Sequence, residues 1–207
     1  MKLVRPFSLF FTLALMFVLI GCSDDTTKPA PVIDTQAETV EELMAFFVAS
    51  YADMDGAKYR DLLDSRFRFF YTDGEDHDYD AEQRIIGNIF SGNPPTNPPP
   101  YSWHQGIRSI EFDMLRIQGA WAPVDVAHAD FGSIPGAMRG YFEIFVIFHH
   151  DAGTITISSG QLFYAVPVER LVGGATITEW KLLGQEDVAV KASNEDMSWS
   201  GLKSLFR

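Results

Sequence analysis

Three polar residues at alternate positions, Arg139, Tyr141 and Glu143, form the pattern in this chain best suited to acid–base chemistry. They interrupt the apolar stretch Met138–His149, and alternate residues of a strand share one face. If that face lines a pocket, Glu143 is a candidate acid or base and Tyr141 a candidate hydrogen-bond donor. If it faces water, the three form an ordinary cross-strand polar set, which is the commoner arrangement because charged residues are rarely buried without partners.

The histidines do not form the pattern of a metal site. His149 and His150 are consecutive, so their side chains point to opposite faces of a strand and do not converge on one ion. They fit the end of a hairpin. His77 lies between Asp76 and Asp78 in an expected solvated loop, without the ordered alternation of a calcium loop. The sequence therefore indicates no metal site.

Signatures of the common enzyme classes are absent from the sequence. It contains no nucleophile elbow, phosphate-binding glycine loop, zinc-ligand spacing or dinucleotide fingerprint. Tyr51 and Tyr59 follow the apolar stripes of predicted helices, which favours core packing over oxyanion donation. We expect no cofactor and assign no catalytic residue. The formal charge of −12 argues against nucleic acid as a partner, because phosphates would be repelled.

The first 21 residues have the layout of a cleavable signal peptide, with Lys2 and Arg5 ahead of an apolar run. As a helix, residues 7–21 would rise only about 22 Å, short of the roughly 30 Å that a membrane span must cross. Leu19–Cys22 resembles the lipobox of bacterial lipoproteins, which implies diacylglycerol on Cys22, the one cysteine of the chain. The alternative is an ordinary signal followed by a lone buried cysteine.

Lipid on Cys22 would hold the protein on a membrane without a spanning helix. Ser23, in place of aspartate after the cysteine, resembles the sorting signal for the outer membrane. We therefore expect a lipid-anchored protein of the bacterial cell envelope that faces the periplasm. Residues 22–36 are polar and contain Pro29 and Pro31, which predicts a flexible tether.

Hydrophobic periodicity next predicts two helices, a strand and a third helix. A possible capping box at Thr35–Glu38 precedes the first helix. The apolar residues of that helix recur with helical spacing at Val40, Leu43, Met44, Phe47, Val48 and Tyr51. Asp55 can cap a second, short helix. Ser65–Thr72 has the aromatic alternation of a strand, and Asp80–Phe90 forms the third helix.

The second half of the chain changes to strands. They are expected at Ile107–Gln118, Met138–His149, Thr154–Val166 and Thr176–Leu183. A C-terminal tail, residues 191–207, follows and can gather Trp199, Leu202, Leu205 and Phe206 on one side of a short helix. Such a tail covers a sheet edge or its own core, or it docks to a partner.

This order of elements resembles the nuclear transport factor 2-like (NTF2-like), or cystatin-like, superfamily. The residues that carry the resemblance are Tyr59–Leu63 leading into Phe67–Phe70, the long pair Tyr141–Phe148 and Leu162–Val166, and the closing Glu179–Leu183. The resemblance implies an α+β cone over residues 37–190, with about three N-terminal helices packed on a curved antiparallel sheet. In this superfamily the interior is commonly a pocket, used by isomerases, cyclases, dehydratases and hydrolases and by many noncatalytic proteins.

Three hypotheses follow. The first is a noncatalytic lipoprotein whose cone binds a small apolar molecule or an envelope protein. The second is a cofactor-independent isomerase, cyclase or hydrolase that uses Glu143 and Tyr141. The third is an assembly role, in which two copies form a homodimer through the open face of the sheet. A fold by itself does not choose between them.

Overall fold

The computed structural model describes residues 36–96, 105–188 and 197–207. The signal peptide, Cys22 and most of the predicted tether lie outside these residues. No helix of the described part is long and apolar enough to cross a membrane.

The N-terminal helices begin at side-chain caps. They are α1 (Val40–Ala52), α2 (Gly56–Leu62) and α3 (Tyr79–Phe90). The Thr39 hydroxyl caps α1 by accepting a hydrogen bond from the Glu42 backbone N–H at 3.1 Å, so the cap lies beyond the predicted box at Thr35–Glu38. Asp55 caps α2 as predicted, and Asp78 caps α3.

Within the described residues, one sheet contains seven strands. They are β1 (Leu63–Phe70), β2 (Asp76–Asp78), β3 (Ser109–Ile117), β4 (Ala122–Pro123), β5 (Met138–His150), β6 (Gly153–Val172) and β7 (Ala175–Val188). The order is β2-β1-β7-β6-β5-β3, and β4 pairs with β5. β1 and β7 run parallel, so the sheet is mixed rather than wholly antiparallel. The two strands are far apart in sequence, and no hairpin dictates their relative direction.

The short strand β2 replaces part of a predicted loop. It pairs with β1 in antiparallel register, with His77 opposite Phe69. The two rings stack with centroids 5.1 Å apart, and the His77 side chain is 7% exposed. A residue expected in solvent is therefore held against the core.

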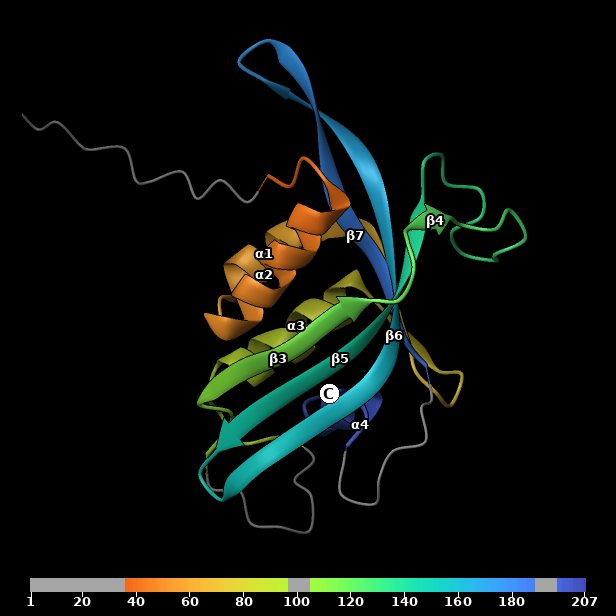
Figure 1. The fold of residues 1–207 in the computed structure, drawn as a ribbon. Coiled ribbons are helices and arrows are strands. Elements are labelled where there is room, and N and C mark those ends of the chain that lie inside the picture. Colours follow the sequence, from red (N-terminus) through yellow and green to blue (C-terminus); the bar gives the residue numbers. More distant parts are fainter. Residues whose placement is uncertain (1–35, 97–104, 189–196) are drawn as a thin grey trace, which may run out of the picture. The chain divides into compact units, whose positions relative to one another are not determined.

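Helices α1, α2 and α3 pack on one face of the curved sheet (Figure 1). Strand alternation points four buried β5 residues to that face: Phe142, Ile144, Val146 and Phe148. A second apolar cluster lies on the other face, where Phe131 from the segment 124–137 packs on Tyr164 of β6. The expected α+β cone of helices on a curved sheet is confirmed.

The C-terminal helix α4 (Trp199–Leu205) belongs to the core of the domain. Trp199, Leu202 and Phe206 are at most 1% exposed. The Ser200 backbone N–H donates to Asp187 of β7 at 2.8 Å, and Asn88 of α3 donates to the Phe206 carbonyl at 3.0 Å. The tail thus covers its own core, one of the arrangements predicted from its apolar spacing.

Strands β6 and β7 continue beyond the sheet as a two-stranded ribbon (Figure 1). Pairing of β6 with β5 ends at Ala165, and pairing of β7 with β1 begins at Leu182. Between these points, Val166–Val172 and Ala175–Lys181 pair with each other. The turn at Gly173 and Gly174 has positive φ at both residues, the conformation of a tight hairpin turn that glycine adopts most easily.

Candidate ligand-binding site

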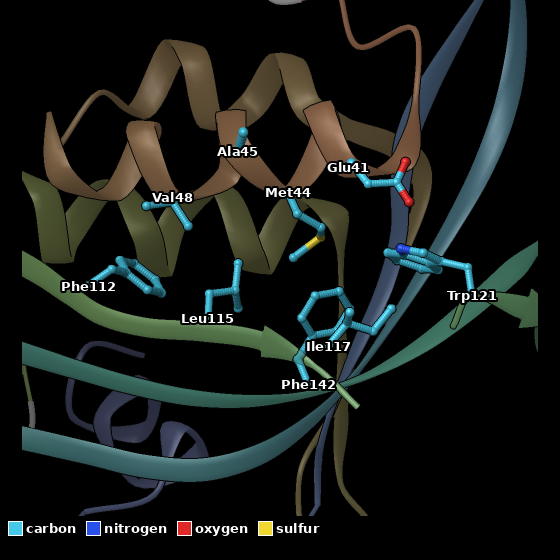
Figure 2. Close-up of a pocket in the computed structure, with 9 residues that line it drawn as sticks. All are labelled: Glu41, Met44, Ala45, Val48, Phe112, Leu115, Ile117, Trp121 and Phe142. Atoms are coloured by element: carbon cyan, nitrogen blue, oxygen red, sulfur yellow. The ribbon is translucent and has the colours of Figure 1, made fainter. Parts of the chain in front are cut away.

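An open apolar groove lies between α1 and the edge strand β3, and we call it the α1–β3 groove. Its volume is about 520 Å³. The lining residues are Glu41, Met44, Ala45, Val48, Phe112, Leu115, Ile117, Trp121 and Phe142 (Figure 2). This size is within the range of sites that take small organic molecules, which are usually apolar with few polar groups.

One side of the groove is a stripe of α1. Glu41, Met44, Ala45 and Val48 are spaced three, four and seven residues apart, so they share one side of the helix. Leu43 and Phe47, on the adjoining side, are fully buried in the core. The α1 sequence therefore divides its apolar residues between the core and an open surface.

The other side of the groove depends on a bulge in β3. The register against β5 shifts between Phe112 and Met114. After the shift, Leu115 and Ile117 lie opposite Ile144 and Phe142 and face the helices, as Phe112 does before it. Strict alternation from Phe112 would have turned Leu115 and Ile117 away, because one extra residue exchanges the faces of a strand.

Trp121 closes one end of the groove. Its ring lies 5.6 Å from that of Phe142, centroid to centroid. Gly140 leaves room for both rings, because a Cβ there would lie 2.9 Å from the Phe142 ring and 3.1 Å from the indole and would make them shift. Figure 2 shows the Glu41 carboxylate at the same end as Trp121, with Val48 and Phe112 at the other. The groove thus offers a long apolar surface with one acidic end.

Arg139, Tyr141 and Glu143 lie outside this groove. They alternate with Phe142 and Ile144, which take the helix-covered face, so they point to the opposite one. Glu143 accepts hydrogen bonds from Arg116 at 2.9 Å and Gln118 at 2.8 Å. The Tyr141 ring lies over Gly160, where a side chain would collide with it. This geometry is the cross-strand polar set, because the aromatic residues of β5 occupy the core positions.

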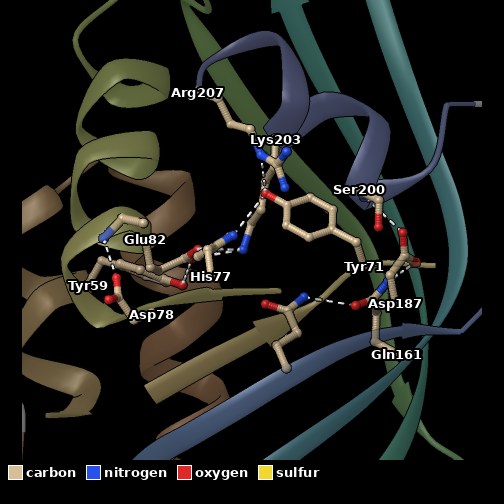
Figure 3. A network of polar contacts seen from close by, with 12 residues as sticks. Tyr59, Tyr71, His77, Asp78, Glu82, Gln161, Asp187, Ser200, Lys203 and Arg207 are labelled. Carbon is tan, nitrogen blue, oxygen red and sulfur yellow. Dashed lines mark hydrogen bonds and ion pairs between the residues drawn. The ribbon is translucent and has the colours of Figure 1, made fainter. Parts of the chain in front are cut away.

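A buried polar cluster lies beneath α4, and we call it the Glu82 cluster: Glu82, Tyr59, His77 and Lys203 (Figure 3). Glu82 and Lys203 are 0% exposed, and Lys203 Nζ donates to both carboxylate oxygens at 2.8 Å. The Tyr59 hydroxyl donates to Glu82 Oε1, and His77 Nε2 lies 2.6 Å from Oε2. Every lone-pair direction of the buried carboxylate therefore has a nearby donor.

These contacts bias Glu82 toward its ionised form. Burial alone would raise the pKa of the Glu82 carboxyl, but the Lys203 charge and the hydrogen bonds from His77 and Lys203 outweigh it and lower that pKa to about 2. Burial also lowers the pKa of Lys203, against the opposing charge of Glu82. The Lys203 ammonium lies 3.6 Å above the centre of the Phe69 ring, which adds a cation–π contact.

His77 connects this cluster to the surface. Burial lowers the pKa of His77, although its hydrogen bond to Glu82 opposes the shift. The carboxylate can only accept, so Nε2 carries the proton and Nδ1 of the neutral ring accepts from the Tyr71 hydroxyl, 2.8 Å away. Arg207 Nε in turn donates to that hydroxyl at 3.2 Å. The arrangement holds α4 and the C-terminal residue in place.

The sequence reasoning missed Glu82 and Lys203. Both stand on apolar helical stripes: Glu82 precedes Ile85 and Ile89 by three and seven residues, and Lys203 follows Trp199 by four. A charge on such a stripe is the signal that could have found them. Within the ranges that the structure describes, no group of three His, Cys, Asp or Glu side chains could hold a metal ion.

The described domain has helices packed on one face of a curved mixed sheet, the architecture that the resemblance to NTF2-like proteins implies. No family model matches the chain, and no curated protein matches it. Solved structures that align with it include an NTF2-like protein from Cytophaga hutchinsonii (12% identity, 73% of this chain and 95% of that chain, TM-score 0.43). An NTF2-like protein from Rhodospirillum rubrum aligns at 9% identity (73% and 98%, TM-score 0.42), and one with a cystatin-like fold from Novosphingobium aromaticivorans at 8% (75% and 82%, TM-score 0.42). Likeness at this level assigns no function.

Proposed function

We propose that this protein is a lipid-anchored lipoprotein of the bacterial envelope whose NTF2-like domain binds a small, elongated, largely apolar molecule. The observation that carries the binding role is the α1–β3 groove, about 520 Å³ in volume, with one carboxylate, Glu41, among its lining residues. A molecule with an apolar body and a hydroxyl or amine at one end fits this distribution, because that end can donate to Glu41 while the body covers the apolar wall.

A binding role is better supported than a catalytic one. Among the described residues that line the groove, Glu41 is the one ionisable group, and acid–base catalysis usually relies on more than one positioned group. Glu82 is a poor proton acceptor because its pKa is about 2 and Lys203 occupies both oxygens. Glu143, the acid of the enzymatic alternative, lies on the opposite face of the sheet and accepts a hydrogen bond from Arg116.

Filling the groove tests this proposal. The probe is N-phenyl-1-naphthylamine, an apolar fluorophore whose emission rises in apolar sites, titrated into residues 22–207 carrying Cys22→Ser. Ala45→Trp places a large ring on an exposed groove position and is expected to weaken probe binding at least tenfold. Ala57→Trp, at an exposed position of α2 outside the groove, is the matched control and should bind like the parent. Equal binding by both variants would overturn the groove as the site.

The anchoring role rests on the sequence of residues 1–22. The mass of the processed protein from membranes of its native host should correspond to a chain that begins at an acylated Cys22. Density-gradient separation of the two membranes should place it with the outer membrane. A mass without acyl groups would contradict the anchor. Sedimentation of the same preparation would reveal a homodimer, the alternative role expected from the sheet face.

A further inference from the structure

Beyond its base, the ribbon formed by β6 and β7 has no further described strand paired with either edge. Residues Val166–Val172 and Ala175–Lys181 have each other as their sheet partners, whereas the rest of both strands lies inside the sheet. Two-stranded ribbons are marginally stable in water unless a further surface covers one face. A second surface in contact with the outer part of the ribbon would therefore stabilise it.

The tip of this ribbon is apolar and uncharged. Leu171 is 73% exposed and Val172 is 43% exposed, and these two are the large apolar side chains that the ribbon leaves in solvent. The six residues Leu171–Thr176 include no charge, although the whole chain has a formal charge of −12. The nearest charges along the ribbon are Glu169 and Arg170 on β6 and Glu179 and Lys181 on β7, two of each sign. Arg170 lies 3.5 Å from Glu179, which also pairs with Lys181. The tip is thus a place where this acidic protein can approach an anionic surface with little repulsion.

The described chain begins beside the base of the same ribbon. The Ala37 carbonyl accepts a hydrogen bond from the Trp180 backbone N–H at 2.8 Å, and Trp180 pairs with Pro167 at the start of the ribbon. From Pro167 to Val172 the ribbon extends five residues, about 17 Å at strand rise. Gln36 is fourteen positions after Cys22, and a flexible chain of that length would have a root-mean-square span of about 20 Å.

We propose that the ribbon tip, Leu171–Thr176, is a second membrane contact that inserts Leu171 and Val172 among the headgroups of the bilayer holding the lipid anchor. The proposal rests on the proposed acylation of Cys22. The described chain begins beside the base of the ribbon, and a flexible tether from there to Cys22 would span a distance similar to the length of the ribbon. A bilayer that held the acyl chains would then be within reach of the tip. Two weak apolar attachments on one molecule reinforce each other, because the second forms at the high effective concentration set by the first.

A fluorophore at the tip tests this contact. The full processed lipoprotein with Leu171→Cys, labelled with the environment-sensitive dye NBD, is reconstituted into vesicles of phosphatidylethanolamine and phosphatidylglycerol. An acylated Cys22 has no free thiol, so the label reports position 171 alone. Ala152→Cys, in the exposed turn between β5 and β6, is the control. Emission at position 171 should rise at least twofold and be quenched by doxyl-labelled lipid, whereas position 152 should show neither effect.

The other outcomes distinguish failure of the membrane contact from failure of the lipid anchor. An acylated protein whose position 171 behaves like position 152 would overturn the membrane contact and leave the anchor intact. A rise in emission that doxyl-lipid does not quench would assign the tip to a protein surface and would also overturn the proposal. A mass spectrum that shows unmodified Cys22 would overturn the anchor, and the membrane contact with it. Circular dichroism of both labelled proteins verifies the fold.

Discussion

The Glu82 cluster and the α1–β3 groove lie on the same helix-covered face of the sheet, yet they use opposite kinds of residue. The cluster concentrates a carboxylate, an ammonium, an imidazole and a phenol in a closed space where Glu82 and Lys203 have no exposure. The groove is open and nearly all apolar, with one carboxylate at its end. The residues best suited to acid–base chemistry are therefore hydrogen-bonded or ion-paired with one another. The groove, which is better suited to binding, has one ionisable residue, Glu41, in its lining.

The two regions differ because α4 covers the Glu82 cluster, whereas the α1–β3 groove is open along the edge of the sheet. Over the cluster, α4 supplies Lys203 and excludes water, so the polar groups are satisfied internally and hold the helix in place. Along the groove, β3 is the last strand of the sheet, and no described element covers the outer side of Phe112, Leu115 and Ile117. A reaction centre needs both access and polar groups, and each region has one of the two.

Breaking the buried ion pair should have the largest effect. Lys203→Met leaves Glu82 charged and unpaired in the core, and we expect the free energy of unfolding in urea to fall by about 3–5 kcal/mol. Glu82→Leu combined with Lys203→Met should recover most of that loss. Lys58→Met, which removes an exposed pair with Asp53, is the control and should change stability far less. Wild-type stability of Lys203→Met would show that the pair does not hold α4.

Lowering the pH should destabilise the fold through the same cluster, without any mutation. The folded-state pKa of Glu82, about 2, lies below the ordinary value of 4.5, so this group stabilises the fold above pH 4.5 and the stabilisation is lost as the pH falls toward 2. The contribution is on the order of 3 kcal/mol. The lowered pKa of His77 has the same sign: its stabilisation is present above about pH 6.5 and is lost on acidification below that.

Urea unfolding between pH 3 and pH 8 measures both steps. The variant with Glu82→Leu and Lys203→Met should have a smaller lower step and keep the upper one. Some of the lower step remains because Arg66 lowers the pKa of Asp64 against the effect of burial. His150 also has a lowered pKa because of burial, so His77→Gln should shrink the upper step without removing it. An unchanged lower step in the double variant would mean that another carboxyl group causes the acid sensitivity.

The smallest expected effect concerns the acidic end of the groove. Glu41→Gln should weaken dodecylamine binding about two- to fivefold, the size of an exposed ion pair, because Glu41 is solvent-accessible. Dodecanol, which lacks the charge, should bind parent and variant alike. Displacement of N-phenyl-1-naphthylamine measures both ligands. Equal loss for the two ligands would indicate a change of groove shape, and no loss for either would place the ligand's polar end elsewhere.

Much of the fold could be predicted from the sequence because its elements have strong local signals. The apolar spacing of α1 and α3, the Asp55 cap and the alternation in β5 each belong to a single segment. The parallel pairing of β1 with β7 could not be predicted in this way, because it depends on contacts between distant segments. Neither could the groove, since the bulge near Met114 exchanges the faces of β3 without a proline or glycine to mark it.

The site residues were harder to predict from the sequence, because their burial also depends on contacts between distant segments. Alternation correctly grouped Arg139, Tyr141 and Glu143 on one face, but a pattern of period two does not state which face is covered. Burial of Glu82 depends on Lys203, which is 121 residues away, and neither charge alone predicts its partner. The ribbon beyond Ala165 was missed because β6 continues as a strand after it leaves the sheet.

The contacts of α4 have a consequence for the order of folding. Trp199, Lys203 and Phe206 complete a core whose first described member is Ala37. Contacts of such long sequence separation form late, because the intervening loop must close first. Until α4 docks, Glu82 has no counterion, so the three N-terminal helices and the sheet form a core that stays incomplete.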